Sequence, residues 1–278
     1  MPGKFVMRWL ASAALALAAL MAAMPASAQA PAPSKAAEQL RTEIALQFGA
    51  EEQLDAALKK AYGVELTEEK AAVSRRALRA LLFNDATADY IAKSLTPDRV
   101  PLSRQDVLPV VMEGILELQV KGLRRLAPNR QAQLVSHLVD MARALPHSAC
   151  KALLLGQMAT TEAADLERRF IASLPLSRFE GVVTVYREAT EAELAGYPDA
   201  RTVNAQQARL AQKAYDEAIG KRVRAQAPRK AIARVNADTA SAPADEVCAV
   251  LTASVHAMLD MPEPYKSWQL SRFVQAMQ

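Results

Sequence analysis

The chain of 278 residues has few cysteines, few glycines and few aromatic residues, and each shortage excludes a class of protein. Its two cysteines, Cys150 and Cys248, are too few for a small disulfide-rich scaffold or a cysteine-based zinc finger. Nine glycines disfavour sheets with many glycine turns, whereas about one residue in five is alanine, the strongest helix former. Because 51% of the residues are hydrophobic, the chain can bury a core. The composition predicts an all-α protein.

Long hydrophobic runs are also scarce, and the longest lies at the start of the sequence. Two basic residues precede the run from Trp9 to Met24, and the small residues Ala26-Ser27-Ala28 follow it. These are the three parts of a secretory signal peptide, so we expect residues 1–28 to be removed on export. The alternative is an uncleaved membrane anchor, but Pro25 ends the run before it reaches the roughly 20 residues that span a bilayer.

Cleavage after Ala28 leaves a chain that is close to neutral. It removes two basic residues and no acidic one, so the formal charge changes from +4 to +2, with 32 basic against 30 acidic residues. Residues 29–33 combine proline and alanine and predict a short extended tether. No later segment is long and apolar enough to span a membrane. We therefore expect a periplasmic or secreted protein without a transmembrane segment after cleavage.

Helical periodicity and helix-breaking residues predict about ten or eleven helices. Apolar residues recur three or four positions apart, and residues such as Gly49, Gly63 and Pro146 end the repeats. The β-branched segment 182–185 would suit a short strand, but no second strand is predicted to pair with it, so we favour a helix. The predicted architecture is a compact multi-helix bundle or an irregular stack of helical hairpins.

Two prolines in residues 96–101 predict a boundary inside the exported chain. It separates an N-terminal helical subdomain, residues 34–95, from a C-terminal helical domain, residues 101–278, which contains both cysteines. The tetrapeptide Leu-Ser-Arg-Phe at 176–179 recurs at 270–273, which leaves a duplication of two halves open.

The two cysteines allow two interpretations. Cys150 and Cys248 each lie near the start of a predicted helix, with a leucine three residues later on the same face. In an oxidising compartment, two cysteines without a third predict a disulfide. The alternative is a thiolate nucleophile at Cys150, activated by His147. We favour the disulfide because the predicted export places the chain in an oxidising space.

The segment 221–234 contains six basic residues and no acidic one. One interpretation is structural: the cations complement the end of the preceding helix, and the remainder is a solvated connector divided by Pro228. The other is an anion-facing patch, whose partner would be an anionic envelope surface or an envelope protein. We expect no nucleic-acid partner, because the segment has no aromatic residue on which bases could stack. The candidate patch residues are Lys221, Arg222, Arg224, Arg229, Lys230 and Arg234.

Motifs for catalysis, metals or cofactors are missing from the sequence. It has no glycine-rich phosphate loop, no G-x-S-x-G elbow and no H-E-x-x-H helix. The three histidines, His137, His147 and His256, are far apart in sequence, and we expect each to be a surface or half-buried helix residue. Trp268 lies between Tyr265 and Phe273 at spacings that suit docking the last helix onto the core. We therefore expect no metal and no cofactor.

These features favour an exported, non-catalytic helical protein that acts by binding, as an accessory, adaptor or holdase-like component of the envelope. One alternative is a hydrolase of cell-wall or envelope substrates whose carboxylates are brought together by the fold. The acid pairs Glu51-Glu52, Glu68-Glu69 and Asp245-Glu246 instead favour a structural role, because they lie in predicted first helical turns, where the helix dipole stabilises negative charge. A structural envelope protein is the third alternative.

Overall fold

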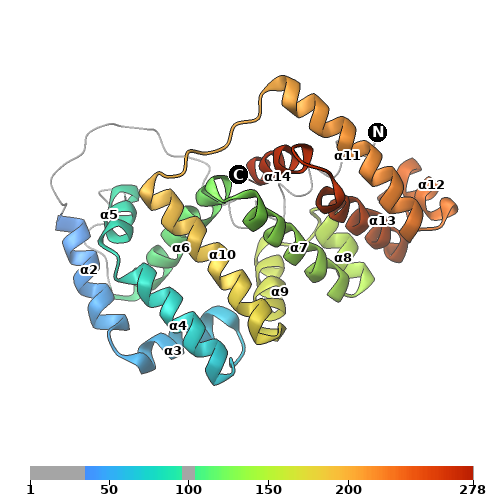
Figure 1. Cartoon of the computed structure of the whole chain (residues 1–278). Helices are drawn as coiled ribbons and strands as arrows, with labels where there is room; N and C mark the ends of the chain where they lie inside the picture. The colour runs from blue at the N-terminus through green and yellow to red at the C-terminus, as the bar shows by residue number, and fades with distance from the viewer. Residues whose placement is uncertain (1–34, 96–103, 278) are drawn as a thin grey trace. The chain divides into compact units, whose positions relative to one another are not determined.

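The computed structural model describes residues 35–95 and 104–277 (Figure 1). Over these residues the chain forms thirteen α-helices and no strand, which confirms the predicted all-α multi-helix fold. The predicted signal peptide 1–28, the tether 29–33 and the boundary segment 96–101 lie outside the described residues.

The helices are joined by short connections, and two 3-10 turns, η2 and η3, extend α6 and α13. The α-helices are α2 (Lys35–Phe48), α3 (Glu51–Tyr62), α4 (Glu68–Leu82), α5 (Asp85–Ser94), α6 (Arg104–Gly122), α7 (Pro128–Ala144), α8 (His147–Leu154), α9 (Thr160–Ser173), α10 (Leu176–Ala195), α11 (Ala205–Gln226), α12 (Arg229–Ala237), α13 (Ala244–His256) and α14 (Tyr265–Gln275); the turns are η2 (Leu123–Arg125) and η3 (Ala257–Asp260).

Two helices are followed by a glycine in the left-handed conformation. Gly63 follows α3 and Gly196 follows α10, with φ angles of 66° and 64°. This left-handed region favours glycine because a Cβ atom is disfavoured there. The β-branched segment 182–185 lies inside α10, so the preference for a helix over a strand is confirmed.

The predicted number of ten or eleven helices is too low, and α12 explains part of the difference. Residues 229–234 belong to the segment that one interpretation treated as a solvated connector, but they lie in helix α12. Ala231 and Val235 are four residues apart, and both are buried. The burial of this short apolar face stabilises α12. In the sequence, the many basic residues obscure the helical spacing of these two residues.

The described helices form two compact units, and neither is continuous in sequence. The N-terminal unit contains the described residues up to Arg125 together with Ile171–Asp199; the C-terminal unit contains Leu126–Phe170 and Ala200–Gln278. Helix α10 therefore belongs with α2 to α6. Helix α6, which follows the predicted boundary segment 96–101, also packs with α2 to α5 in the N-terminal unit.

The core of the N-terminal unit is made of aliphatic residues and one phenylalanine from α2 to α6. Helix α10 packs along α6 and α4. At Gly122, the last residue of α6, a Cβ atom would lie 1.8 Å from the carbonyl oxygen of Ala189 on α10, so only glycine permits this close approach. The buried cluster contains Leu40, Ile44, Phe48, Leu54, Leu81, Leu82, Ala88, Ile91, Val107, Val111 and Ile115.

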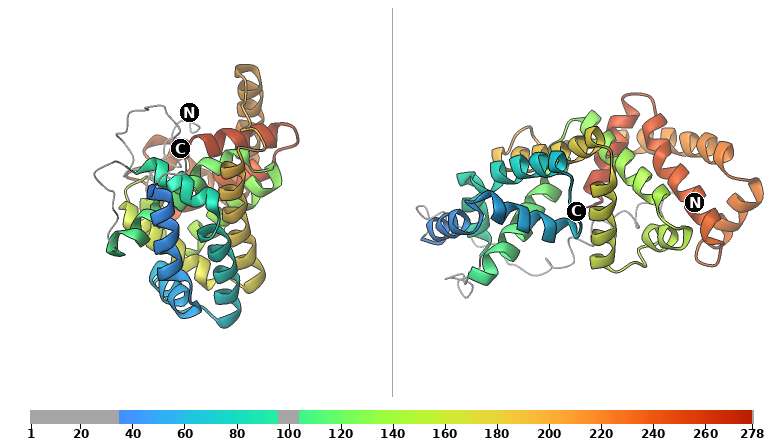
Figure 2. Two further views of the ribbon diagram at one scale, coloured as in Figure 1. Left: turned by 90° about the vertical axis from the view of Figure 1, so that its left-hand side faces the viewer. Right: turned by 90° about the horizontal axis from the view of Figure 1, so that it is seen from below.

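Helix α13 is the central element of the C-terminal unit. It contacts α7, α8, α11 and α12, and eight of its residues are buried. Its apolar character on all sides suits a helix with neighbours around it. Figures 1 and 2 show α12 at the C-terminal end of α11, next to α13. This arrangement fixes the segment that carries the predicted anion-facing patch.

Candidate functional site

The basic segment 221–234 is helical on both sides of Pro228. Helix α11 continues to Gln226, and α12 begins at Arg229. Apolar residues at a four-residue spacing hold one face of the segment against the C-terminal unit. The segment is therefore not a connector, whereas Arg224 does lie in the last turn of α11, as the structural interpretation expected. The buried residues are Val223, Ala227, Ala231 and Val235.

Two of the six predicted patch residues have acidic partners. On α12, Arg234 donates from Nε to Oε2 of Glu246 at 2.9 Å, and its Nη2 contacts the other carboxylate oxygen. On α11, the Nε atom of Arg222 lies 3.4 Å from Oδ2 of Asp260, and its Nη2 contacts the ring of His256. Both arginines join their helices to the α13–η3 segment. Their positive charge is therefore compensated within the protein.

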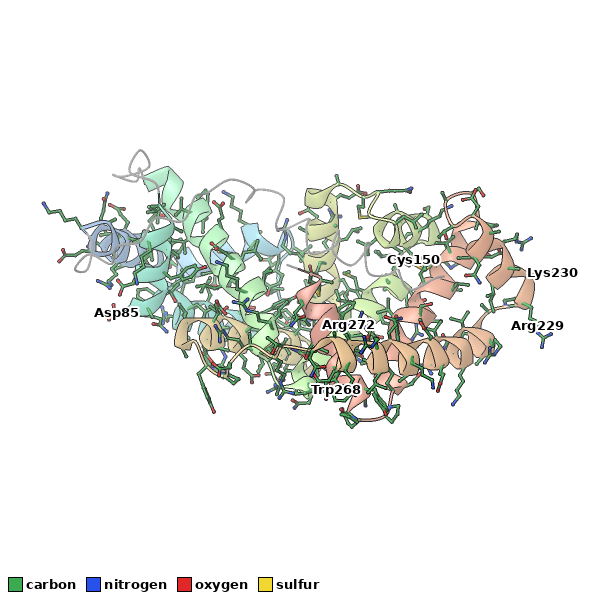
Figure 3. All side chains as sticks on the ribbon, turned by 90° about the horizontal axis from the view of Figure 1, so that it is seen from above. Asp85, Cys150, Arg229, Lys230, Trp268 and Arg272 are labelled. Atoms are coloured by element: carbon green, nitrogen blue, oxygen red, sulfur yellow. A yellow bond between two sulfur atoms is a disulfide. The ribbon has the colours of Figure 1, made fainter. Side chains whose placement is uncertain are left out.

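The other four cations make no ion pair in the part of the chain that the structure describes. We call them the basic corner: Lys221 and Arg224 near the end of α11, and Arg229 and Lys230 in the first turn of α12. All four are exposed. Figure 3 shows Arg229 and Lys230 at the outer edge of their unit.

Two of these cations do not stabilise the helix on which they lie. Arg229 and Lys230 follow Pro228, the N-cap of α12, whose side chain makes no capping hydrogen bond. The N-terminus of a helix carries a partial positive charge, so cations in the first turn are destabilising. The neighbouring helix α13 instead has Asp245 and Glu246 at this position. Positive charge at the start of α12 thus opposes the usual electrostatic preference.

Covalent and polar contacts fix the elements next to the basic corner. The Sγ atoms of Cys150 on α8 and Cys248 on α13 are 1.95 Å apart, so the predicted pair lies at disulfide distance. Lys151 Nζ donates to the carbonyl oxygens of Ala240 and Ala242 at 2.6 Å, in the connection between α12 and α13. These contacts fix α13 and the connection that leads to it from α12. With its sulfur bonded, Cys150 is not a free nucleophile.

The three histidines lie in three different environments. His147 is exposed, as expected. His137 was expected at or near the surface, but it is buried in α7, where its ring packs on Phe170 with 5.4 Å between centroids. It follows Leu134 by three residues, which places it on the same inward face. Burial lowers the pKa of His256, and the nearby charge of Arg222 lowers it further.

Acidic residues in the predicted first turns form ion pairs with arginines. In the N-terminal unit Arg75 is surrounded by Glu51, Asp55 and Glu68, with nitrogen–oxygen distances of 3.1, 2.8 and 2.5 Å. Asp55 and Glu68 raise the pKa of Arg75, chiefly because their carboxylates accept hydrogen bonds from its guanidinium. They link α3 to α4, which supports a structural role. Among the described residues, no group of three histidine, cysteine, aspartate or glutamate side chains is placed to hold a metal ion.

Helix α14 docks through only one of the three aromatic residues expected to do so. Trp268 is half-buried, and its ring meets that of Tyr265 edge to face at 5.6 Å. Phe273 is buried, and Leu270 and Val274 complete the docking face. Figure 3 shows Trp268 and Arg272 on α14. Helix periodicity places Phe273 on the buried face, so the sequence did contain this signal.

Arg272 and the Arg222–His256 contact are polar features that sequence reasoning missed. Arg272 Nη1 donates to the carbonyl oxygen of Ala208 and to Oε1 of Gln212 and Gln269, which holds α14 to α11. These contacts join residues far apart in the chain, so no local pattern predicts them.

The chain matches no protein-family model, and searches of curated proteins and of solved structures return no match. Within residues 35–95 and 104–277, no helix is both long and apolar enough to cross a membrane.

Proposed function

We propose that the protein is exported to the envelope and acts there, without catalysis, by binding an anionic partner through the basic corner. The proposal rests on one observation: the six cations of segment 221–234 differ in whether they have a carboxylate partner. Arg222 and Arg234 have carboxylates within 4 Å, whereas Lys221, Arg224, Arg229 and Lys230 are exposed and have none among the described residues. Clustered, uncompensated cations attract anions over a range of about 10 Å at 0.1 M salt.

Two further features support export. Residues 1–28 have the composition of a signal peptide, and a disulfide between Cys150 and Cys248 suits an oxidising compartment. The mass of the intact exported protein tests this part of the proposal. We expect the mass of residues 29–278. A mass that includes residues 1–28 would contradict cleavage and favour an anchored protein.

Retention on an immobilised polyanion such as heparin tests the binding. The protein should elute at a lower salt concentration after four substitutions in the basic corner, K221Q, R224Q, R229Q and K230Q. A control with the same loss of charge replaces four exposed cations that are separated in sequence, K60Q, R76Q, K93Q and R209Q. Equal elution of the two variants would show that net charge alone governs retention and would contradict a specific site.

A further inference from the structure

We infer that the anionic partner of the basic corner is the head-group surface of a phospholipid bilayer. This inference rests on the proposed function, and it names the partner of the same site. The argument depends on three properties of the corner: the chemistry of its exposed side chains, their placement on two helices, and the rigidity of what lies beneath them.

The basic corner lacks the aromatic and large aliphatic side chains that, with arginine, anchor protein–protein interfaces. Between the cations the exposed positions are Ala225, Gln226 and Pro228, and Ala233 follows on α12. Among the described residues, every large hydrophobic side chain that is exposed lies outside 221–234. Interfaces between folded proteins depend on a few desolvated aromatic or arginine anchors in pockets. A charged lipid surface needs no such pockets, because its head groups move to meet the cations.

The placement of the four cations suits a broad surface. Lys221 and Arg224 are three residues apart and so lie on one face of α11, while Arg229 and Lys230 begin α12 on the other side of Pro228. The cations therefore come from both helices at the place where they meet. Lysine and arginine have long flexible side chains that keep their charge in water while they approach a surface.

The buried face of the same segment keeps the cations directed outwards. Val223 and Ala227 on one side of the bend, and Ala231 and Val235 on the other, are buried against the C-terminal unit. Helix α12 has no large exposed apolar residue that would enter the hydrocarbon layer. Attachment is therefore electrostatic and reversible, rather than an insertion of an amphipathic helix.

The strength of attachment follows from the number of cations. Each lysine or arginine near an anionic bilayer increases partitioning by about a factor of five at moderate salt. Four together give an increase on the order of several hundredfold. Because the charges stay in water, salt screens this attraction.

The test is co-sedimentation of the full-length exported protein with vesicles of equal parts phosphatidylglycerol and phosphatidylcholine. We expect binding that falls by about 100-fold or more in the variant K221Q/R224Q/R229Q/K230Q, and much less in the control K60Q/R76Q/K93Q/R209Q. Vesicles of phosphatidylcholine alone should not bind, and salt at about 0.5 M should release the protein. Circular dichroism of each variant confirms that the helices are retained.

A charge-preserving variant separates a lipid surface from a protein partner. R224K/R229K keeps four positive charges but removes the planar guanidinium groups that pair with carboxylates through two hydrogen bonds. A lipid surface should bind this variant within about twofold of the unmodified protein. Heparin retention that depends on the corner, without binding to anionic vesicles, would overturn the lipid inference and leave the proposed function standing. If the four substitutions K221Q, R224Q, R229Q and K230Q weakened neither heparin retention nor vesicle binding, both the lipid inference and the proposed function would be overturned.

Discussion

The guanidinium of Arg222 on α11 lies against the imidazole of His256 at the end of α13, with Nη2 3.0 Å from Nε2. The ring is partly desolvated, and both effects favour its neutral form. Arg143 of α7 acts in the same direction, whereas Asp140 of α7 and Asp260 of η3 oppose it. The net result is a pKa for His256 below its usual value.

This lowered pKa predicts a pH dependence of stability. The histidine of the unfolded chain takes up a proton near pH 6.5, while the folded chain does so only at a lower pH. The unfolded state therefore binds more protons in that window, and the free energy of unfolding falls as pH decreases through it. We expect His256→Gln to reduce this slope in urea unfolding measured between about pH 7.5 and 5. An unchanged slope would mean that His256 titrates alike in both states.

A disulfide between Cys150 and Cys248 should contribute strongly to the free energy of unfolding. The cysteines are 98 residues apart in sequence. Closing a loop of about 100 residues in the unfolded chain is worth roughly 4 to 5 kcal/mol by the loop-entropy relation, less any native strain. The double variant C150A/C248A should show a loss of this order in urea unfolding. Alkylation of the unreduced, denatured protein checks the bond directly: labelling of both cysteines would contradict it.

The sequence predicted those parts of the fold that depend on neighbouring residues. Gly63 ends a helix because its local backbone requires a positive φ, and the spacing of Leu153 and Leu251 from the cysteines marked the inward faces of α8 and α13. Helix α12 was missed because Pro228 and six cations obscured two buried residues at helical spacing.

The candidate site was predicted only in part, since its definition depends on contacts between distant segments. The six cations were identified from sequence, but their separation into two groups was not. Arg222 finds Asp260 and Arg234 finds Glu246, and both partners come from the α13–η3 segment. The position of α10 in the N-terminal unit is likewise set by packing against α4 and α6, which no local pattern encodes.

The close approach of α6 and α10 predicts opposite effects of two glycine substitutions. In Gly122→Ala the new methyl group would meet the carbonyl oxygen of Ala189, so we expect a loss of about 1–3 kcal/mol or more as the helices separate. In Gly181→Ala, within α10, a Cβ atom would meet nothing within 4 Å. Higher helix propensity should then stabilise the protein by about 0.5–1 kcal/mol. Thermal unfolding measures both, and equal effects would contradict the packing.

Arg125 connects the end of η2 to the C-terminal end of α10. Its Nε atom donates to Oε2 of Glu193 at 2.6 Å, and its Nη1 atom donates to the carbonyl oxygens of Gly196 and Pro198. The side chains of Arg125 and Glu193 are only 15% and 12% exposed. Removing Glu193 would leave the Arg125 guanidinium without a carboxylate, and removing Arg125 would leave the Glu193 carboxylate with Arg124 alone; both are costly in a site of low exposure.

A double-mutant cycle tests this connection against an exposed pair on the same helix. The pair Arg187 and Glu191 of α10 has a similar distance, 2.8 Å, but side chains that are 39% and 42% exposed. We expect a coupling energy of about 1–3 kcal/mol for R125A with E193A, and of about 0.3–0.5 kcal/mol for R187A with E191A. Arg125→Lys should recover little, because one ammonium group does not reach the carboxylate and both carbonyls with the geometry of a guanidinium. Equal coupling in the two cycles would mean that burial adds nothing to the Arg125–Glu193 pair.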